Sequence, residues 1–229
     1  DIAEFQIMLQ SAGKWFTDEN GSADFKNNEA LKECFEIFKT LNESDYVKVV
    51  SDWTEFAGAI NGGDVACVLR GSWISSTIIQ GEDQSGKWAV APVPALSVSG
   101  ATNYSNQGGS SWFVLANSKN SEVAADFMAK TFGGSAELYN TLLGEKNIMG
   151  TYLPASSVEA YSAGSDFYGG QTVNADLAQW LGKIPAVATG AFSAEAQSAL
   201  LGVMPEYLAG GDLDTVLEEA AMQFEQLIQ

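Results

Sequence analysis

The sequence contains no histidine, and this absence limits the chemistry that the chain can perform. Histidine is the commonest general base, and the Ser-His and Cys-His nucleophile pairs both require it. Two cysteines without a histidine do not supply the usual ligand set of a zinc site. Neither a phosphate-binding Walker loop nor the dinucleotide-binding G-x-G-x-x-G pattern occurs. We therefore expect no catalytic residue of these kinds, no metal and no cofactor.

Basic residues are also scarce. Eleven Lys and Arg stand against 29 Asp and Glu, which gives a formal net charge of −18. Such a surface repels phosphate groups, so nucleic acid and anionic membrane surfaces are poor partners. Some of the many carboxylates must lie close together, and a glycosidase needs one such pair. The sequence singles out no pair, and a solvated acidic surface is the simpler explanation.

Long apolar runs are missing, since no stretch approaches the roughly 18 residues that a membrane span needs. The chain starts at Asp1, without a signal peptide and within a pattern typical of a helix. We interpret it as a piece of a longer protein, so that its start says nothing about compartment. With 229 residues, 46% of them hydrophobic, it can form one large domain or two small ones.

The two cysteines, Cys34 and Cys67, lie among apolar residues in a helical and a strand pattern, respectively. Because free cysteine is often buried, both are predicted to be small buried hydrophobic residues. A disulfide between them stays open, since sequence alone does not decide a pairing.

Helical and strand patterns alternate along the chain. Asn28 is the expected N-cap of a helix with one apolar face, and Asp52 and Glu55 have capping-box spacing before another helix. The dipeptide Asn20-Gly21 predicts a turn between two short strands. Further strands are predicted at 65–69, 87–96 and 110–117, and further helices at 1–12, 122–132, 136–143, 173–182, 194–208 and 213–228. This alternation predicts an α/β fold with a largely parallel sheet.

Six tryptophans are many for this length. Trp53 and Trp180 occur in helical patterns beside apolar neighbours, which predicts core packing. Trp73 differs, because it follows Gly71 where the predicted strand 65–69 ends and a helix begins. Ligands of open α/β sheets bind outside the carboxyl ends of the strands, and a flat ring suits the CH-rich face of a sugar. On spacing alone, a ring that plugs the end of the sheet is equally compatible.

A glycine-rich polar segment precedes the predicted strand that starts at Ser110. Gly108 and Gly109 allow a ligand to approach backbone N–H groups closely, and side chains such as Gln107 suit sugar hydroxyls. An ordinary polar loop explains the same composition. Residues 166–174 repeat the combination of an aromatic ring, two glycines and amides.

Taken in order, the motifs resemble those of one family. "GDVACVLRGSW" (63–73) resembles a small-residue turn, an apolar strand and a Gly-x-Trp, and "WAVAPVPAL" (88–96) follows. "GGSSWFVLANSKNSEVAADFMAKTF" (108–132) resembles a glycine pair, a strand, a Ser-Lys-Asn turn and an Ala-rich helix. "YLPASS", "FYGGQ" and "LAGGDLDTVLEEAAMQFEQLI" close the chain in the family's order. The set resembles the maltose-binding-like, family 1 solute-binding proteins of sugar ABC importers, and fits the lactose- and arabinose-type branch best.

The resemblance covers nearly all of this chain but only the carboxyl-terminal part of the family. It implies an α/β, periplasmic-binding-protein-like fold of the class II type, with two lobes that this chain contains incompletely. Residues 1–109 would belong to the carboxyl-terminal lobe, and 110–154 would form a hinge strand and a returning segment of the amino-terminal lobe. Residues 155–229 would complete the carboxyl-terminal lobe with the terminal helices.

The resemblance also implies a sugar-binding site. Trp73 matches a tryptophan that stacks on a sugar ring, and the Gly-Gly-Ser that starts at Gly108 matches a hinge segment that hydrogen-bonds to the ligand. Phe192 and, more loosely, Tyr168 lie near the places of further aromatic residues. The expected sugar-binding residues are Gly71, Ser72, Trp73, Gln107, Gly108, Gly109, Ser110, Tyr168 and Phe192.

By the same resemblance, the protein is expected to be the substrate-binding component of an ABC sugar importer and not an enzyme. It would close its lobes on a mono- or oligosaccharide by hinge motion and deliver the sugar to the membrane permease. It would be bacterial, monomeric and extracytoplasmic, either periplasmic or lipid-anchored at the outer face of the membrane. A carbohydrate-active enzyme or accessory carbohydrate-binding domain with a carboxylate pair is the alternative, and a purely structural domain is the third.

Overall fold

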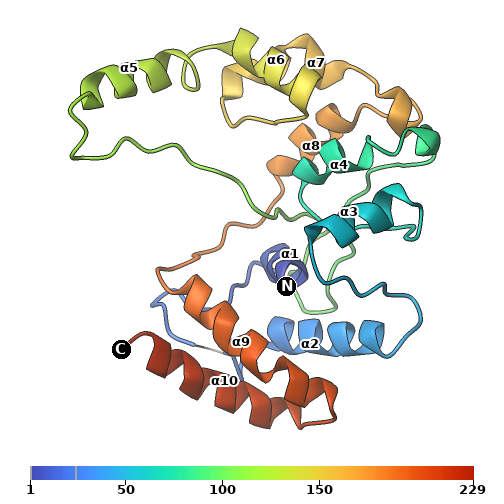
Figure 1. Ribbon diagram of the computed structural model, residues 1–229. Coiled ribbons are helices and arrows are strands. Elements are labelled where there is room, and N and C mark those ends of the chain that lie inside the picture. The colour runs from blue at the N-terminus through green and yellow to red at the C-terminus, as the bar shows by residue number, and fades with distance from the viewer. Residues whose placement is uncertain (1, 24) are drawn as a thin grey trace. The chain divides into compact units, whose positions relative to one another are not determined.

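The computed structural model describes residues 2–23 and 25–229, which divide into two compact units (Figure 1). Unit 1 comprises Asp1–Val49, Pro92–Gln107 and Lys183–Gln229, and unit 2 comprises Val50–Ala91 and Gly108–Gly182. The passage from Gln107 to Gly108 lies close to the hinge expected at residues 109 and 110. The assignment of the three stretches of sequence to lobes stays a prediction.

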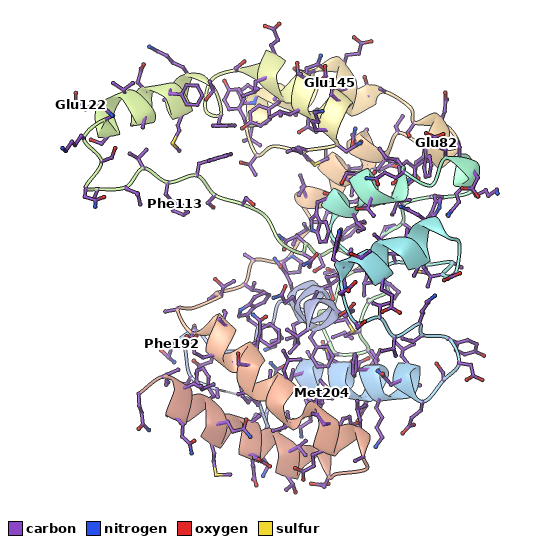
Figure 2. The ribbon with its side chains drawn as sticks, in the orientation of Figure 1. Glu82, Phe113, Glu122, Glu145, Phe192 and Met204 are labelled. Atoms are coloured by element: carbon purple, nitrogen blue, oxygen red, sulfur yellow. The ribbon has the colours of Figure 1, made fainter. Side chains whose placement is uncertain are left out.

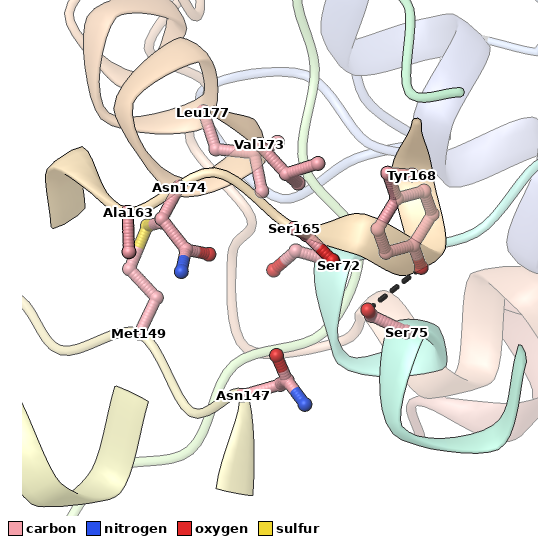
Figure 3. A pocket seen from close by; sticks show the side chains of 10 residues that line it. All are labelled: Ser72, Ser75, Asn147, Met149, Ala163, Ser165, Tyr168, Val173, Asn174 and Leu177. Atoms are coloured by element: carbon pink, nitrogen blue, oxygen red, sulfur yellow. Dashed lines mark hydrogen bonds between the residues drawn. The ribbon is translucent and has the colours of Figure 1, made fainter. Parts of the chain in front are cut away.

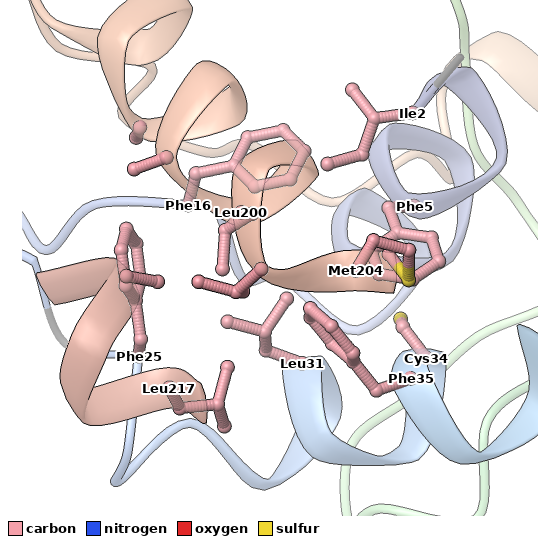
Figure 4. Close-up of a cluster of buried hydrophobic side chains, with 14 of the residues drawn as sticks. Ile2, Phe5, Phe16, Phe25, Leu31, Cys34, Phe35, Leu200, Met204 and Leu217 are labelled. Atoms are coloured by element: carbon pink, nitrogen blue, oxygen red, sulfur yellow. The ribbon is translucent and has the colours of Figure 1, made fainter. Parts of the chain in front are cut away.

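Unit 1 is built from helices. They are α1 (Ala3–Ser11), α2 (Glu29–Asn42), α9 (Ser193–Leu208) and α10 (Leu213–Leu227). The short connection between α9 and α10 makes them an antiparallel pair that packs side by side, and α1 packs on α2 (Figure 1). Their facing side chains form one core, in which Phe5, Phe35, Leu200 and Leu217 are fully buried (Figure 4).

Local sequence signals set the start of α2 as predicted. The Asn28 side chain accepts a hydrogen bond from the backbone N–H of Leu31 at 3.2 Å, which confirms the N-cap. Leu31, Cys34 and Phe35 are fully buried, whereas Leu41 at the far end of the predicted apolar face is 43% exposed. The predicted apolar face is therefore buried in the first turns of α2, and the carboxyl-terminal end of the helix extends beyond the core.

Unit 2 contains shorter elements around a smaller core. They are α3 (Trp53–Asn61), η1 (Ser72–Ile74), α4 (Ser75–Ile78), η2 (Glu82–Gln84), α5 (Ser121–Lys130), α6 (Ala136–Lys146), η3 (Leu153–Ser157), α7 (Glu159–Ser162), η4 (Asp166–Tyr168) and α8 (Val173–Leu181). Ile60, Ile74 and Ile78 form its core, with Phe56 and Trp88 packed against them. Across the described residues of both units, no helix has the length and apolar character that crossing a membrane requires.

The predicted parallel sheet is absent from the part of the chain that the structure describes, and this prediction was wrong. The segments 65–69, 87–96 and 110–117 form no strand. Among the described residues, the β-pairings are two isolated antiparallel bridges elsewhere, Thr17 with Ala23 and Ser165 with Gln171. A strand needs a neighbour that pairs its backbone groups, and that neighbour is distant in sequence. A local apolar pattern therefore does not make a strand alone.

The prediction for the cysteines was half right. Cys34 is buried, and burial raises the pKa of its thiol. Cys67 is exposed, and the segment that carries it does not form the predicted buried strand. Both thiols are free, so the disulfide that the sequence left open is not formed.

Candidate functional site

Trp73 lies on the short helix η1, which follows Gly71 and leads directly into α4. Gly71 has an extended backbone with φ −65° and ψ 161°, so the chain turns sharply into η1 at this point. Ile74, the next residue after Trp73, is buried in the core of unit 2 and anchors η1. The Trp73 side chain keeps 39% of its surface exposed. Its ring therefore lies at the surface of unit 2 and does not fill a core.

Gly108 lies against the Trp73 indole, although the two residues are far apart in sequence. A Cβ atom on residue 108 would lie 3.3 Å from Nε1 and 3.8 Å from Cδ1 of Trp73. Gly108 has φ +82° and Gly109 has φ +112°, values that residues with a side chain rarely adopt. The structure thus brings together two groups of residues that the sequence had placed in one site. Glycine is required at position 108 both by the backbone and by the close approach of the ring.

The structure adds Trp53 to this surface, where we had predicted a core residue. Trp53 is 55% exposed, and its ring centroid lies 6.0 Å from that of Trp73 with 36° between the planes. Its ring also contacts Phe56, at 5.4 Å between centroids. The prediction failed because Trp53 is the first residue of α3, beyond the reach of the small core of unit 2. The sequence did contain a signal for this position, because Trp53 directly follows the predicted cap residue Asp52 and so had to lie at the start of the helix. Trp180, predicted likewise, is half-buried.

A small cavity in unit 2 is lined by Ser72, the residue that precedes Trp73 in the sequence (Figure 3). Ser72 and Ser75 are three positions apart, so they share a face of the 3₁₀ turn and both line the cavity. Its volume of about 40 Å³ holds a few water-sized groups, at roughly 10–15 Å³ each, and not a sugar ring. The remaining lining residues are Asn147, Met149, Ala163, Ser165, Tyr168, Val173, Asn174 and Leu177. None of the lining residues is charged, and the hydroxyl and amide groups among them suit neutral hydroxyls.

Tyr168 contributes to this cavity from η4. Its side chain is buried, and its hydroxyl is hydrogen-bonded to the Ser75 hydroxyl at 2.7 Å (Figure 3). Burial raises the pKa of Tyr168, while the hydrogen bond to Ser75 acts in the opposite direction. The phenol therefore stays neutral, and the ring supports the start of α4 instead of offering an exposed face.

The remaining expected site residues lie in different places. Ser110 is exposed in unit 2, whereas Gln107 and Phe192 belong to unit 1. Phe192 directly precedes α9, is 38% exposed and lies beside Gly21. The sugar-binding roles of all these residues stay predictions. Ser75, Asn147 and Ser165 were missed, because single serines and asparagines carry no distinguishing pattern, whereas Asn174 lies in the segment 166–174 that the sequence had singled out.

Several glutamates lie exposed on the surface of unit 2. Glu82, Glu122 and Glu145 are exposed and project outward (Figure 2). Among the described residues, no cluster of three or more His, Cys, Asp or Glu is arranged to hold a metal ion. Trp73 therefore offers exposed aromatic surface, and the cavity lined by Ser72 offers neutral hydrogen-bonding groups.

Comparison with known proteins identifies the family. The family model described as "Bacterial extracellular solute-binding protein" matches residues 3–165. The chain belongs to this family. A curated relative of this solute-binding chain, the lactose-binding protein of Rhizobium radiobacter, is 39% identical over 213 residues. The match covers 93% of this chain and 50% of the relative, so the chain spans about half the length of the curated relative that it matches.

Two solved structures share the fold of this solute-binding chain. The first is the ABC transporter associated binding protein from B. animalis subsp. lactis Bl-04 in complex with beta-1,6-galactobiose, with a TM-score of 0.73 at 20% identity. The second is the maltose/maltodextrin-binding domain MalE from Bdellovibrio bacteriovorus bound to maltotriose, with a TM-score of 0.66 at 17% identity. Each match covers 100% of this chain and 58% of the other. The resemblance read from the motifs is confirmed, and so is the likeness in fold, although the described part of the chain is helix-rich.

Proposed function

We propose that this chain is part of the substrate-binding component of an ABC sugar importer, which captures a mono- or oligosaccharide and delivers it to the membrane permease. The observation that carries the proposal is the exposed Trp73 ring held against Gly108 in unit 2. An exposed indole provides a flat apolar face for the CH groups of a sugar. Neutral side chains that follow Gly108 in the sequence, such as Ser110, can exchange hydrogen bonds with sugar hydroxyls.

The relatives support the same class of substrate. The 39% identical relative is named a lactose-binding protein, and the two structural relatives hold galactobiose and maltotriose. We therefore propose a neutral saccharide that contains galactose or glucose. The family is described as extracellular, which supports a location outside the cytoplasm. We further propose a monomer that is either periplasmic or lipid-anchored at the outer face of the membrane.

Binding without turnover is the reaction class that fits best. The relatives are named as binding proteins, one of them for lactose. A glycosidase would require two carboxylates on either side of the scissile bond. These observations support a binding protein over the carbohydrate-active enzyme that the sequence had left as the alternative.

A ligand screen tests the proposal. The full-length protein is titrated with a panel of mono-, di- and trisaccharides that includes lactose, while tryptophan fluorescence, melting temperature and release of reducing sugar are followed. We expect a saturable response to one class of sugar and no new reducing ends. Release of reducing sugar would support the enzyme instead. No change in fluorescence or melting temperature with any sugar of the panel would contradict sugar binding. A purely structural domain would then be the remaining hypothesis.

A further inference from the structure

Two exposed indoles lie next to each other on unit 2, and the proposed function uses only one of them. Trp53 is 55% exposed and Trp73 is 39% exposed, and their rings are neighbours at 6.0 Å between centroids. Adjacent large aromatic rings that remain accessible form an apolar patch of the kind that marks ligand-binding grooves. Trp112, also in unit 2 and 66% exposed, is different, because it stacks on Phe132 at 4.8 Å and 16° and not on Trp73.

Local contacts fix the Trp53 backbone in place. The Asp52 carboxylate accepts a hydrogen bond from the Glu55 N–H at 2.9 Å, and Glu55 in turn accepts from the N–H and the hydroxyl of Ser51 at 2.9 and 2.7 Å. These bonds close the first turn of α3 around Trp53.

The Trp53 side chain is held by its aromatic neighbour. Phe56 packs against one side of the ring, and Phe56 also contacts the core of unit 2. The guanidinium of Arg70 lies 5.1 Å from the Phe56 ring centre and adds a cation–π contact. The ring is thus ordered before any ligand arrives, and ordering of a contact residue in advance lowers the entropy cost of binding.

The relative placement of the two rings indicates more than one sugar ring. Their planes differ by 36° and both side chains are exposed, so the two rings do not form one flat surface. One pyranose ring covers the face of one indole, and a second ring joined through a bent ether link is tilted against the first. We propose that Trp53 binds the second sugar ring, so that the site prefers a disaccharide or longer saccharide over a monosaccharide. This inference rests on the proposed function, in which Trp73 stacks on the first ring.

Calorimetry on the full-length protein separates the two claims. The probes are lactose and its two monosaccharide units, galactose and glucose, each titrated into wild type, Trp53→Ala and Trp73→Ala. We expect Trp53→Ala to lower lactose affinity by about 5- to 30-fold while leaving monosaccharide affinity unchanged. Trp73→Ala should weaken both kinds of sugar. Trp53→Phe, which keeps a ring, should recover most of the lactose affinity and controls for folding together with the melting temperature.

A matched control comes from Trp112→Ala, which removes an exposed indole of the same unit and should leave all sugar affinities as in wild type. Equal lactose affinity in Trp53→Ala and wild type, with loss in Trp73→Ala, would overturn the role of Trp53 and leave the proposed function standing. An equal loss for lactose and monosaccharides in Trp53→Ala would overturn it as well. Absence of any sugar binding by wild type would contradict both claims.

Discussion

The Nε1 atom of Trp73 lies only 3.3 Å from the point where residue 108 would place a Cβ atom, so the indole occupies space that only glycine leaves free. Gly108→Ala should therefore act in two ways. A side chain at φ +82° costs about 1–2 kcal/mol of stability, and the added methyl group displaces the ring. We expect a lower free energy of unfolding and weaker sugar binding, measured by urea denaturation and calorimetry on the full-length protein.

Gly86→Ala is the matched control for this substitution. Gly86 belongs to the same unit and has φ +77°, but nothing lies within 4 Å of its added Cβ atom. It should lose stability to a similar extent and keep its sugar affinity. If both variants bound sugar like wild type, the contact between Gly108 and Trp73 would have no part in ligand binding.

The hydrogen bond between Tyr168 and Ser75 should couple η4 to α4. Tyr168→Phe and Ser75→Ala each remove one hydroxyl of the 2.7 Å pair, and each should lower the free energy of unfolding by about 0.5–1.5 kcal/mol. Because they remove the same bond, the double variant should lose less than the sum. Tyr46→Phe, at a residue that is 91% exposed, should be neutral. Strictly additive losses would show that the two hydroxyls do not stabilise one another.

The buried tyrosines predict a decline of stability in alkali. Burial raises the pKa values of Tyr161, Tyr168 and Tyr207 above the ordinary 10.0. The unfolded chain therefore releases these protons first as the pH rises. The stability that the neutral phenols provide is complete below the unfolded-state pKa, and it is lost progressively as the pH rises through the higher folded-state pKa values. Urea denaturation at a series of pH values up to about 11 should show this decline. The decline should be shallower in Tyr168→Phe, and identical slopes in both proteins would refute a buried neutral phenol at that position.

Neighbouring leucines on α9 test the core of unit 1. Leu200 is fully buried, whereas Leu201 is 40% exposed. Leu200→Ala leaves a cavity and should cost about 2–5 kcal/mol of unfolding free energy, and Leu201→Ala should stay within about 0.5 kcal/mol of wild type. Equal losses in the two variants would mean that the burial seen for Leu200 does not describe the folded protein in solution.

Features decided by neighbouring residues were predictable from the sequence. The caps at Asn28 and Asp52 and the buried start of α2 depend on contacts three or four positions apart, and all three predictions were correct. The strands were not predictable in this way, because each depends on a partner elsewhere in the chain. The predictions that Cys67 and Trp53 are buried failed for a related reason, since the burial of a residue depends on which distant segments cover it.

The candidate site was predictable only in part. The motif order placed Trp73 and Gly108 in one site, and the structure brings these distant residues into contact within unit 2. The neighbouring ring of Trp53 was missed, since a helical pattern does not show how far the core extends along α3. Ser72 and Tyr168, both among the expected residues, line the cavity, but Ser75, Asn147 and Ser165 were missed because the cavity arises from the folding of four separate segments.

The most direct test of sugar stacking on Trp73 is a calorimetric titration of the full-length protein and its Trp73→Ala variant with lactose. Loss of a stacked aromatic ring should reduce the binding free energy by about 1–3 kcal/mol while the melting temperature without sugar changes little. We predict a saturable heat of binding in wild type and a much weaker one in the variant. Equal affinity in the two proteins would contradict the role of Trp73 as the surface on which the sugar stacks.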